Sequence, residues 1–174
     1  MGDDMRTQVK AVLALAGVLA LAGCAFPGMG GSAGSGEPGG PMHGGRQQVS
    51  CADSARVTLD GQRVDYDVVG DCAEVIVRGD DLDVRLAAAT ELSIDGRDND
   101  VESASDLGAV TVKGNGNDVE ARTIASISVA GNDNSLEADT VGSVEIAGDD
   151  NDVEAGNDPQ PVRVSGNGNT VERR

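Results

Sequence analysis

The feature that most constrains this chain is a short motif that recurs at a nearly constant spacing through most of its length. The segment VTVKGNGNDVEA from Val110 is repeated with changes from Leu92, Ile127, Val144 and Val162, and divergent copies begin at Val57 and Val75. The turn glycines of the seven copies are 17 or 18 residues apart: Gly61, Gly79, Gly96, Gly114, Gly131, Gly148 and Gly166. A fixed short period of this kind is typical of repeat architectures.

Within each copy apolar and polar residues alternate, which predicts two short strands separated by a Gly-Asn turn. An antiparallel β meander of hairpins would leave one apolar face uncovered, and no segment has the helical period needed to cover it. Stacked coils would bury the same residues in their interior. The sequence therefore predicts an all-β fold, a parallel β-solenoid of about seven coils over residues 49–174, with the antiparallel meander as the alternative.

Five asparagines follow the turns and share the parity of the apolar residues that point inward. In stacked coils their amides would lie about 4.8 Å apart and could hydrogen-bond to one another, which would satisfy buried polar groups. The alternative is that they are turn residues that tolerate a left-handed backbone. The proposed asparagine ladder consists of Asn99, Asn117, Asn134, Asn151 and Asn169.

Acidic residues occupy the outward positions of the second strand in most copies. Stacking would align them at close range, an unfavourable arrangement that cations would relieve. Carboxylate oxygens suit hard ions such as Ca²⁺, so a divalent cation or a cationic envelope component is a candidate partner. The alternative is a solvated acidic face without a ligand. The face comprises Asp100, Glu102, Asp118, Glu120, Glu137, Asp152, Glu154 and Glu172.

The N-terminus has the layout of a bacterial lipoprotein signal peptide over residues 1–23. Arg6 and Lys10 precede an apolar run over residues 11–22, which is too short to span a bilayer comfortably. Leu21-Ala22-Gly23-Cys24 resembles the lipobox, in which the cysteine thiol accepts diacylglycerol. Asp3 and Asp4 depart from the basic pattern, and initiation at Met5 would remove them. An uncleaved membrane helix or an ordinary secreted protein is the alternative.

Residues 24–48 are rich in Gly, Pro and Ser, a composition that predicts a flexible tether behind the lipidated Cys24. The one histidine of the chain, His43, lies in this stretch and is expected to be solvated. The remaining cysteines, Cys51 and Cys72, belong to the exported part, where a disulfide is expected. Two free buried thiols are the alternative.

Composition argues against several classes of function. The net charge of −17 would repel nucleic acid. Glycine-rich pieces such as Gly114-Asn115-Gly116 lack the following helix and Lys-Ser/Thr pair of a phosphate loop. No nucleophile, histidine or cofactor motif indicates an enzyme, so a polysaccharide-acting enzyme is the least favoured alternative. The last repeat shows no cap, which predicts self-association or a partner contact through the C-terminal coil.

The lipobox at Cys24, the pair Cys51 and Cys72, and the GxxNxVE copies such as residues 148–154 together resemble actinobacterial, mycobacterial-type lipoproteins with an uncharacterised β-repeat domain. The resemblance implies attachment to the outer face of the cell membrane and a β-repeat fold, but no reaction. We therefore expect a membrane-anchored, non-catalytic structural or interaction domain at the cell envelope. A Ca²⁺-binding repeat protein is the principal alternative.

Overall fold

The computed structural model describes residues 45–52 and 54–174, and within these ranges the regular secondary structure is entirely β-strand. The first strand begins at Gln47, inside the stretch that the sequence assigned to the tether. The described residues contain no helix that is long and apolar enough to cross a membrane. The strands are β1 (Gln47–Ser50), β2 (Arg56–Gln62), β3 (Asp65–Asp80), β4 (Asp83–Arg97), β5 (Asp100–Ser103), β6 (Asp106–Asn115), β7 (Asp118–Asn132), β8 (Ser135–Ala147), β9 (Asp152–Ala155), β10 (Val162–Ser165) and β11 (Thr170–Arg173).

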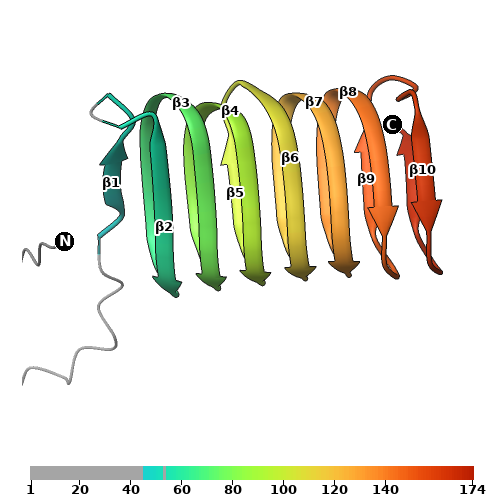
Figure 1. Cartoon of the computed structure of the whole chain (residues 1–174), viewed down its shortest axis with the longest axis horizontal. Coiled ribbons are helices and arrows are strands. Elements are labelled where there is room, and N and C mark those ends of the chain that lie inside the picture. The colour runs from blue at the N-terminus through green and yellow to red at the C-terminus, as the bar shows by residue number, and fades with distance from the viewer. Residues whose placement is uncertain (1–44, 53) are drawn as a thin grey trace, which may run out of the picture. The chain divides into compact units, whose positions relative to one another are not determined.

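The strands of this domain pair in parallel, and each pairing joins residues about one repeat apart. Val110, for example, pairs with Ile127, which in turn pairs with Val144. The chain thus winds through successive coils whose strands lie side by side (Figure 1). The predicted parallel β-solenoid is confirmed, and the meander is excluded because no pair of described strands runs antiparallel.

Each coil contains three pairing segments, one more than the two strands that the sequence predicted. In β7 these are residues 118–121, which we call the acidic side, residues 123–124, the short side, and residues 126–130, the groove side. The three names also cover the equivalent positions of the other coils. The short side escaped prediction because two residues per coil are too few to show alternation, although its inward positions Leu107, Ile124 and Val141 are all aliphatic and buried.

The core consists of inward side chains that stack in columns of similar aliphatic residues. Such columns pack closely without aromatic rings because identical strand geometry is repeated at every level. On the groove side, one column whose members are at most 2% exposed contains Val75, Leu92, Val110, Ile127 and Val144. On the acidic side, a second fully buried column contains Val84, Val101, Val119, Leu136 and Val153.

The turn between the groove side and the acidic side depends on a column of glycines. A Cβ built on Gly131 would overlap the carbonyl oxygen of Gly114, and one on Gly114 would overlap that of Gly96. Glycine is required here because the backbones of successive coils approach too closely for any side chain. Two residues later the backbone is left-handed, with φ near 55° at Asp133 and Asp150.

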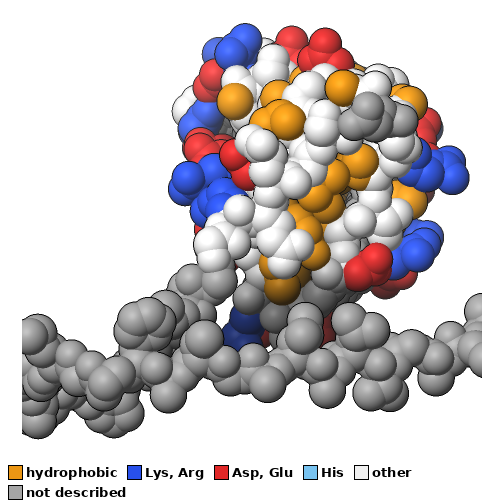
Figure 2. All heavy atoms as spheres, turned by 90° about the vertical axis from the view of Figure 1, so that its left-hand side faces the viewer, with side chains coloured by type: hydrophobic (Ala, Val, Ile, Leu, Met, Phe, Trp, Pro, Cys, Tyr) orange, Lys and Arg blue, Asp and Glu red, His pale blue; other side chains and the backbone are white. Residues whose placement is uncertain are grey.

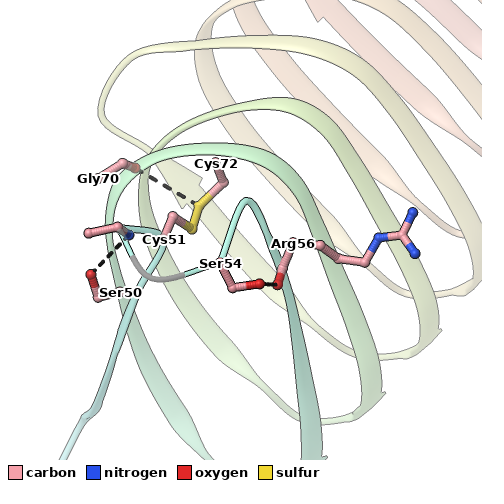
Figure 3. Close-up of a disulfide and its surroundings, with 7 residues drawn as sticks. Ser50, Cys51, Ser54, Arg56, Gly70 and Cys72 are labelled. Atoms are coloured by element: carbon pink, nitrogen blue, oxygen red, sulfur yellow. Dashed lines mark hydrogen bonds between the residues drawn. A yellow bond between two sulfur atoms is a disulfide. The ribbon is translucent and has the colours of Figure 1, made fainter.

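A disulfide joins the first coil to the second. Cys51 and Cys72 are both buried, with their Cα atoms 5.3 Å apart, and Cys72 occupies the core position that Ala89 takes in the next coil. Figure 3 shows the bridge beside the loop that leads into β2. Viewed from the end that carries β1 and β2, charged side chains lie at the periphery and apolar ones nearer the middle (Figure 2). The predicted disulfide is confirmed.

Removing this bridge should destabilise the domain considerably. In the Cys51→Ala/Cys72→Ala variant, we expect the free energy of unfolding to fall by about 3 kcal/mol, because the unfolded chain gains loop entropy. Urea unfolding monitored by far-UV circular dichroism would measure this change. A Ser54→Ala variant, in the same loop, should unfold like the wild type, and equal midpoints for all three proteins would contradict the expectation.

The opposite end of the solenoid exposes two side chains that occupy core columns elsewhere. Val162 and Val164 of β10 are 39% and 46% exposed, whereas their partners Val144 and Ile146 are buried. No described strand stacks on the outer edge of β10 or β11. Self-association through this coil stays a prediction.

Candidate functional site

The five asparagines of the proposed ladder lie in successive coils, and each side chain reaches its neighbour. Asn99 Nδ2 donates to Asn117 Oδ1 at 2.9 Å, and Asn117 Nδ2 donates to Asn134 Oδ1 at 3.0 Å. The chain of amides continues through Asn151 to Asn169 at 2.8 and 2.9 Å. The first four side chains are 99% buried, so this ladder is an interior feature of the corner.

Every hydrogen-bonding atom of an inner amide such as Asn134 has partners in adjacent coils. Its Oδ1 accepts from the Asn117 backbone N–H at 3.1 Å as well as from the Asn117 side chain. Its Nδ2 donates both to Asn151 Oδ1 and to the Gly114 carbonyl at 3.0 Å. Full satisfaction is what makes a buried amide compatible with an aliphatic core. The left-handed turn position is Asp133, so the ladder asparagine does not supply it.

A second ladder, which the sequence reading missed, lies on the outside of the same corner. The Asn132 backbone N–H donates to Asn115 Oδ1 at 2.9 Å, and the Asp149 N–H donates to Asn132 Oδ1 at 2.9 Å. The Asn167 N–H then donates to Asp149 Oδ1 at 2.7 Å. The signal was available, because an Asn or Asp precedes each ladder asparagine by two residues in these copies.

The outward residues of the acidic side also stack in register. Glu120 lies between Glu102 and Glu137, and Glu154 lies between Glu137 and Glu172. Beside this column runs a second, in which Asp100 lies between Asp83 and Asp118. Ser135 separates Asp118 from Asp152, which relieves repulsion at that level. Neighbouring strands are about 4.8 Å apart, so these stacked carboxylates bring like charges close together.

Two aspartates of the second column have raised pKa values. For Asp100 the pKa is raised by partial burial, then by the charges of Asp118, Asp83 and Glu102, while Arg85 opposes the rise. For Asp118 the pKa is raised by partial burial and by Glu137, against a hydrogen bond from the Val119 backbone that lowers it. These carboxylates therefore bind protons more readily in the folded chain than in the unfolded one.

Stability should consequently increase as the pH is lowered from 7 to 5. Because the folded-state pKa values of Asp100 and Asp118 are raised, the folded form binds more protons, and stability falls as pH rises through those values. Thermal unfolding at both pH values, in low salt, measures the effect. The Asp118→Asn variant should show a smaller pH dependence than wild type, and a melting temperature that falls on acidification to pH 5 would contradict the expectation.

Arginines of the chain itself lie at two places along the glutamate column. Arg85 Nε lies 3.4 Å from Glu102 Oε2. Arg174 pairs with Glu137, and its Nη2 lies 2.6 Å from Asp139 Oδ1. Within the described ranges no ion pair joins Glu120 or Glu154 to a cation. Glu120 and Glu154, on either side of the paired Glu137, therefore carry negative charge that no ion pair of the described residues compensates.

The acidic side does not form a preassembled metal site. Residues 45–52 and 54–174 bring together no group of three or more His, Cys, Asp or Glu side chains that could hold an ion. One oxygen, Asp152 Oδ1, is buried without a hydrogen-bond partner. Columns of this kind attract counterions along their length instead of enclosing one ion.

The lipidation site and the preceding segments lie outside the described residues. This applies to the predicted signal peptide over residues 1–23, to Cys24, to most of the tether and to His43. Their roles stay predictions from sequence.

One comparison with known proteins covers part of the repeat. Residues 97–140 match a family model described as a protein of unknown function, DUF3060. This range contains β5, β6, β7 and the first part of β8, with three ladder asparagines, Asn99, Asn117 and Asn134. No curated protein and no solved structure matches the chain. The match thus associates the central coils with an uncharacterised domain and carries no activity.

Proposed function

We propose that this protein is an exported lipoprotein, anchored through Cys24 to the outer face of the bacterial cell membrane, with a non-catalytic interaction domain. The residues that support the anchor are the apolar run over residues 11–22 and the lipobox that ends in Cys24. The Cys51–Cys72 disulfide suits an oxidising compartment outside the cytoplasm. Acyl chains on Cys24 would hold the domain at the surface more firmly than a single myristoyl chain.

The Cys24→Ser substitution tests the anchor. The variant should leave the membrane fraction and appear in soluble fractions or in the medium, because it lacks the thiol that receives the lipid. The Ser32→Ala variant, changed in the same tether, should stay with the membrane. Retention of the Cys24→Ser protein in membranes would contradict lipid anchoring.

The observation that carries the interaction role is the charge of Glu120 and Glu154 on the acidic side, which no ion pair of the described residues compensates. Glu120 and Glu154 lie in a column of like charge on a hydrogen-bonded scaffold that does not need to reorganise. The pairs that Arg85 and Arg174 form with the column show that guanidinium groups fit there. A polycationic component of the envelope, such as a lysine-rich or arginine-rich protein segment, is therefore the partner we propose.

Binding of a deca-lysine peptide to the full-length chain tests this partner class. The Glu120→Gln/Glu137→Gln/Glu154→Gln variant should bind about tenfold more weakly, since each exposed pair contributes a fraction of a kcal/mol. The control Glu91→Gln/Asp95→Asn/Glu145→Gln has the same net charge but is changed on the groove side. Equal loss of affinity in both variants would mean that net charge alone, and not the acidic side, binds the peptide.

Calorimetry with CaCl₂ tests the divalent-cation alternative, which would give heat and a higher melting temperature.

A further inference from the structure

The groove side carries a shallow trough formed by two adjoining cavities. A cavity of about 360 Å³ is lined by Glu74, Glu91, Ser93, Ala109, Thr111 and Lys113. A second cavity, of about 220 Å³, begins at the same Ala109 and Thr111 and continues past Ser126 and Ser143 to Arg163. Because the two share lining residues, the trough crosses successive coils along the solenoid axis.

The floor of the trough is formed by small side chains that occupy consecutive coils. Ala109, Ser126 and Ser143 stack in one row, and Ser93, Thr111 and Ser128 stack in the row beside it. Within the described part of the chain, these five hydroxyl groups make no hydrogen bond to protein, unlike the Ser165 hydroxyl, which donates to the Ile146 carbonyl. The floor thus offers hydroxyl groups repeated at the strand spacing of about 4.8 Å.

The lining excludes most kinds of long ligand. Charges of both signs line the trough. Glu91 ends the row of Ala109, and Glu145 and Arg163 continue the row of Ser128. Because Lys113 also lines the trough, a polyanion or a polycation would meet repulsion. The lining contains no aromatic side chain, and its outward side chains are mostly hydroxyl-bearing or charged, which does not suit a lipid or an amphipathic helix. A peptide cannot add as a strand either, because β6 already pairs with β4 and β7.

A ligand that fits must be long, uncharged and able to hydrogen-bond at every step. We propose that the groove side binds a linear neutral polysaccharide laid along the solenoid axis. Its hydroxyl groups would exchange hydrogen bonds with the two serine and threonine rows, directly or through water. Without aromatic rings to stack on sugar faces, each contact is weak, so affinity grows with the number of coils engaged.

Affinity electrophoresis of the full-length chain through gels that contain hydroxyethylcellulose, soluble xylan or dextran tests the proposal. We expect at least one polymer to retard the wild type. The Ser126→Leu/Ser143→Leu variant, which fills the trough, should bind at least about tenfold more weakly, because several hydrogen bonds are lost together. The matched control, Ser135→Leu/Thr170→Leu on the acidic side, should be retarded like wild type.

A second variant covers the case in which the filled protein does not fold. Thr111→Val/Ser126→Ala/Ser128→Ala removes hydroxyls without adding bulk, and it should also lose retardation while it keeps the wild-type melting temperature. The proposal is overturned if none of the polymers retards the wild type, or if both trough variants are retarded as strongly as wild type. The triple glutamine variant of Glu120, Glu137 and Glu154 should retain polysaccharide binding, so failure here is distinguishable from failure of cation binding.

Discussion

Replacing Gly131 with alanine is expected to lower the free energy of unfolding by about 4 kcal/mol or more, which places it among the most damaging single substitutions. The added Cβ would overlap the carbonyl oxygen of Gly114, a backbone atom that can move only if the stacked coils separate. Backbone conformation is not the cause, because the φ of Gly131 is outside the left-handed region. Urea unfolding followed by circular dichroism would measure the loss.

The Gly70→Ala variant distinguishes the cost of close contact between coils from the cost of backbone strain. Gly70 has a φ of 92°, but an added Cβ would make only ordinary contacts, the nearest being Cys51 Cβ at 3.9 Å. The free energy of unfolding of this variant should fall by about 1 kcal/mol, the usual cost of a left-handed alanine. If Gly131→Ala proved no more damaging than Gly70→Ala, close contact between coils would not be the reason for the glycine column.

The second large effect is expected for Asn134→Ala, at about 4 kcal/mol. The substitution removes the Oδ1 atom that accepts from both the backbone and the side chain of Asn117. It also removes the Nδ2 group that donates to the Gly114 carbonyl and to Asn151. Each buried group left without a partner costs about 1 to 3 kcal/mol, and a small cavity adds to the loss.

Asn132→Ala is the matched control, since Asn132 belongs to the outer ladder only two residues away. Its Oδ1 accepts one hydrogen bond, from the Asp149 N–H, and the side chain is exposed, so water can replace it. We expect a loss of about 1 kcal/mol or less. Similar losses for the two alanine variants would mean that the inner ladder contributes no more than an exposed turn, contrary to the buried network described above.

The repeat in the sequence was sufficient to predict coils, because a period of 17 or 18 residues allows like residues to stack only if each copy completes one turn. The parity of the asparagines with Val101, Val119, Leu136, Val153 and Val171 also predicted which way their amides point. Both inferences rest on local periodicity, which can be read directly from the sequence.

What the sequence did not show depends on distances between coils. The short side was missed because its two residues per coil show no alternation, although the aliphatic residues Leu107, Ile124 and Val141 recur there at the repeat spacing. The trough on the groove side likewise arises where small residues of separate copies, such as Ala109, Ser126 and Ser143, become neighbours.

The sequence by itself determined the all-β repeat, the stacked asparagines and the pair of cysteines. The first two follow from a fixed period that places equivalent residues on top of one another, and the third follows from two cysteines in the same exported part. Only the tertiary structure decided that the left-handed turn residue is Asp133 and not Asn134, and that Arg174 reaches back to Glu137. It also decided which carboxylates lack a cation. The ion pairs follow from how closely residues of different coils approach, a distance that no one copy of the repeat encodes.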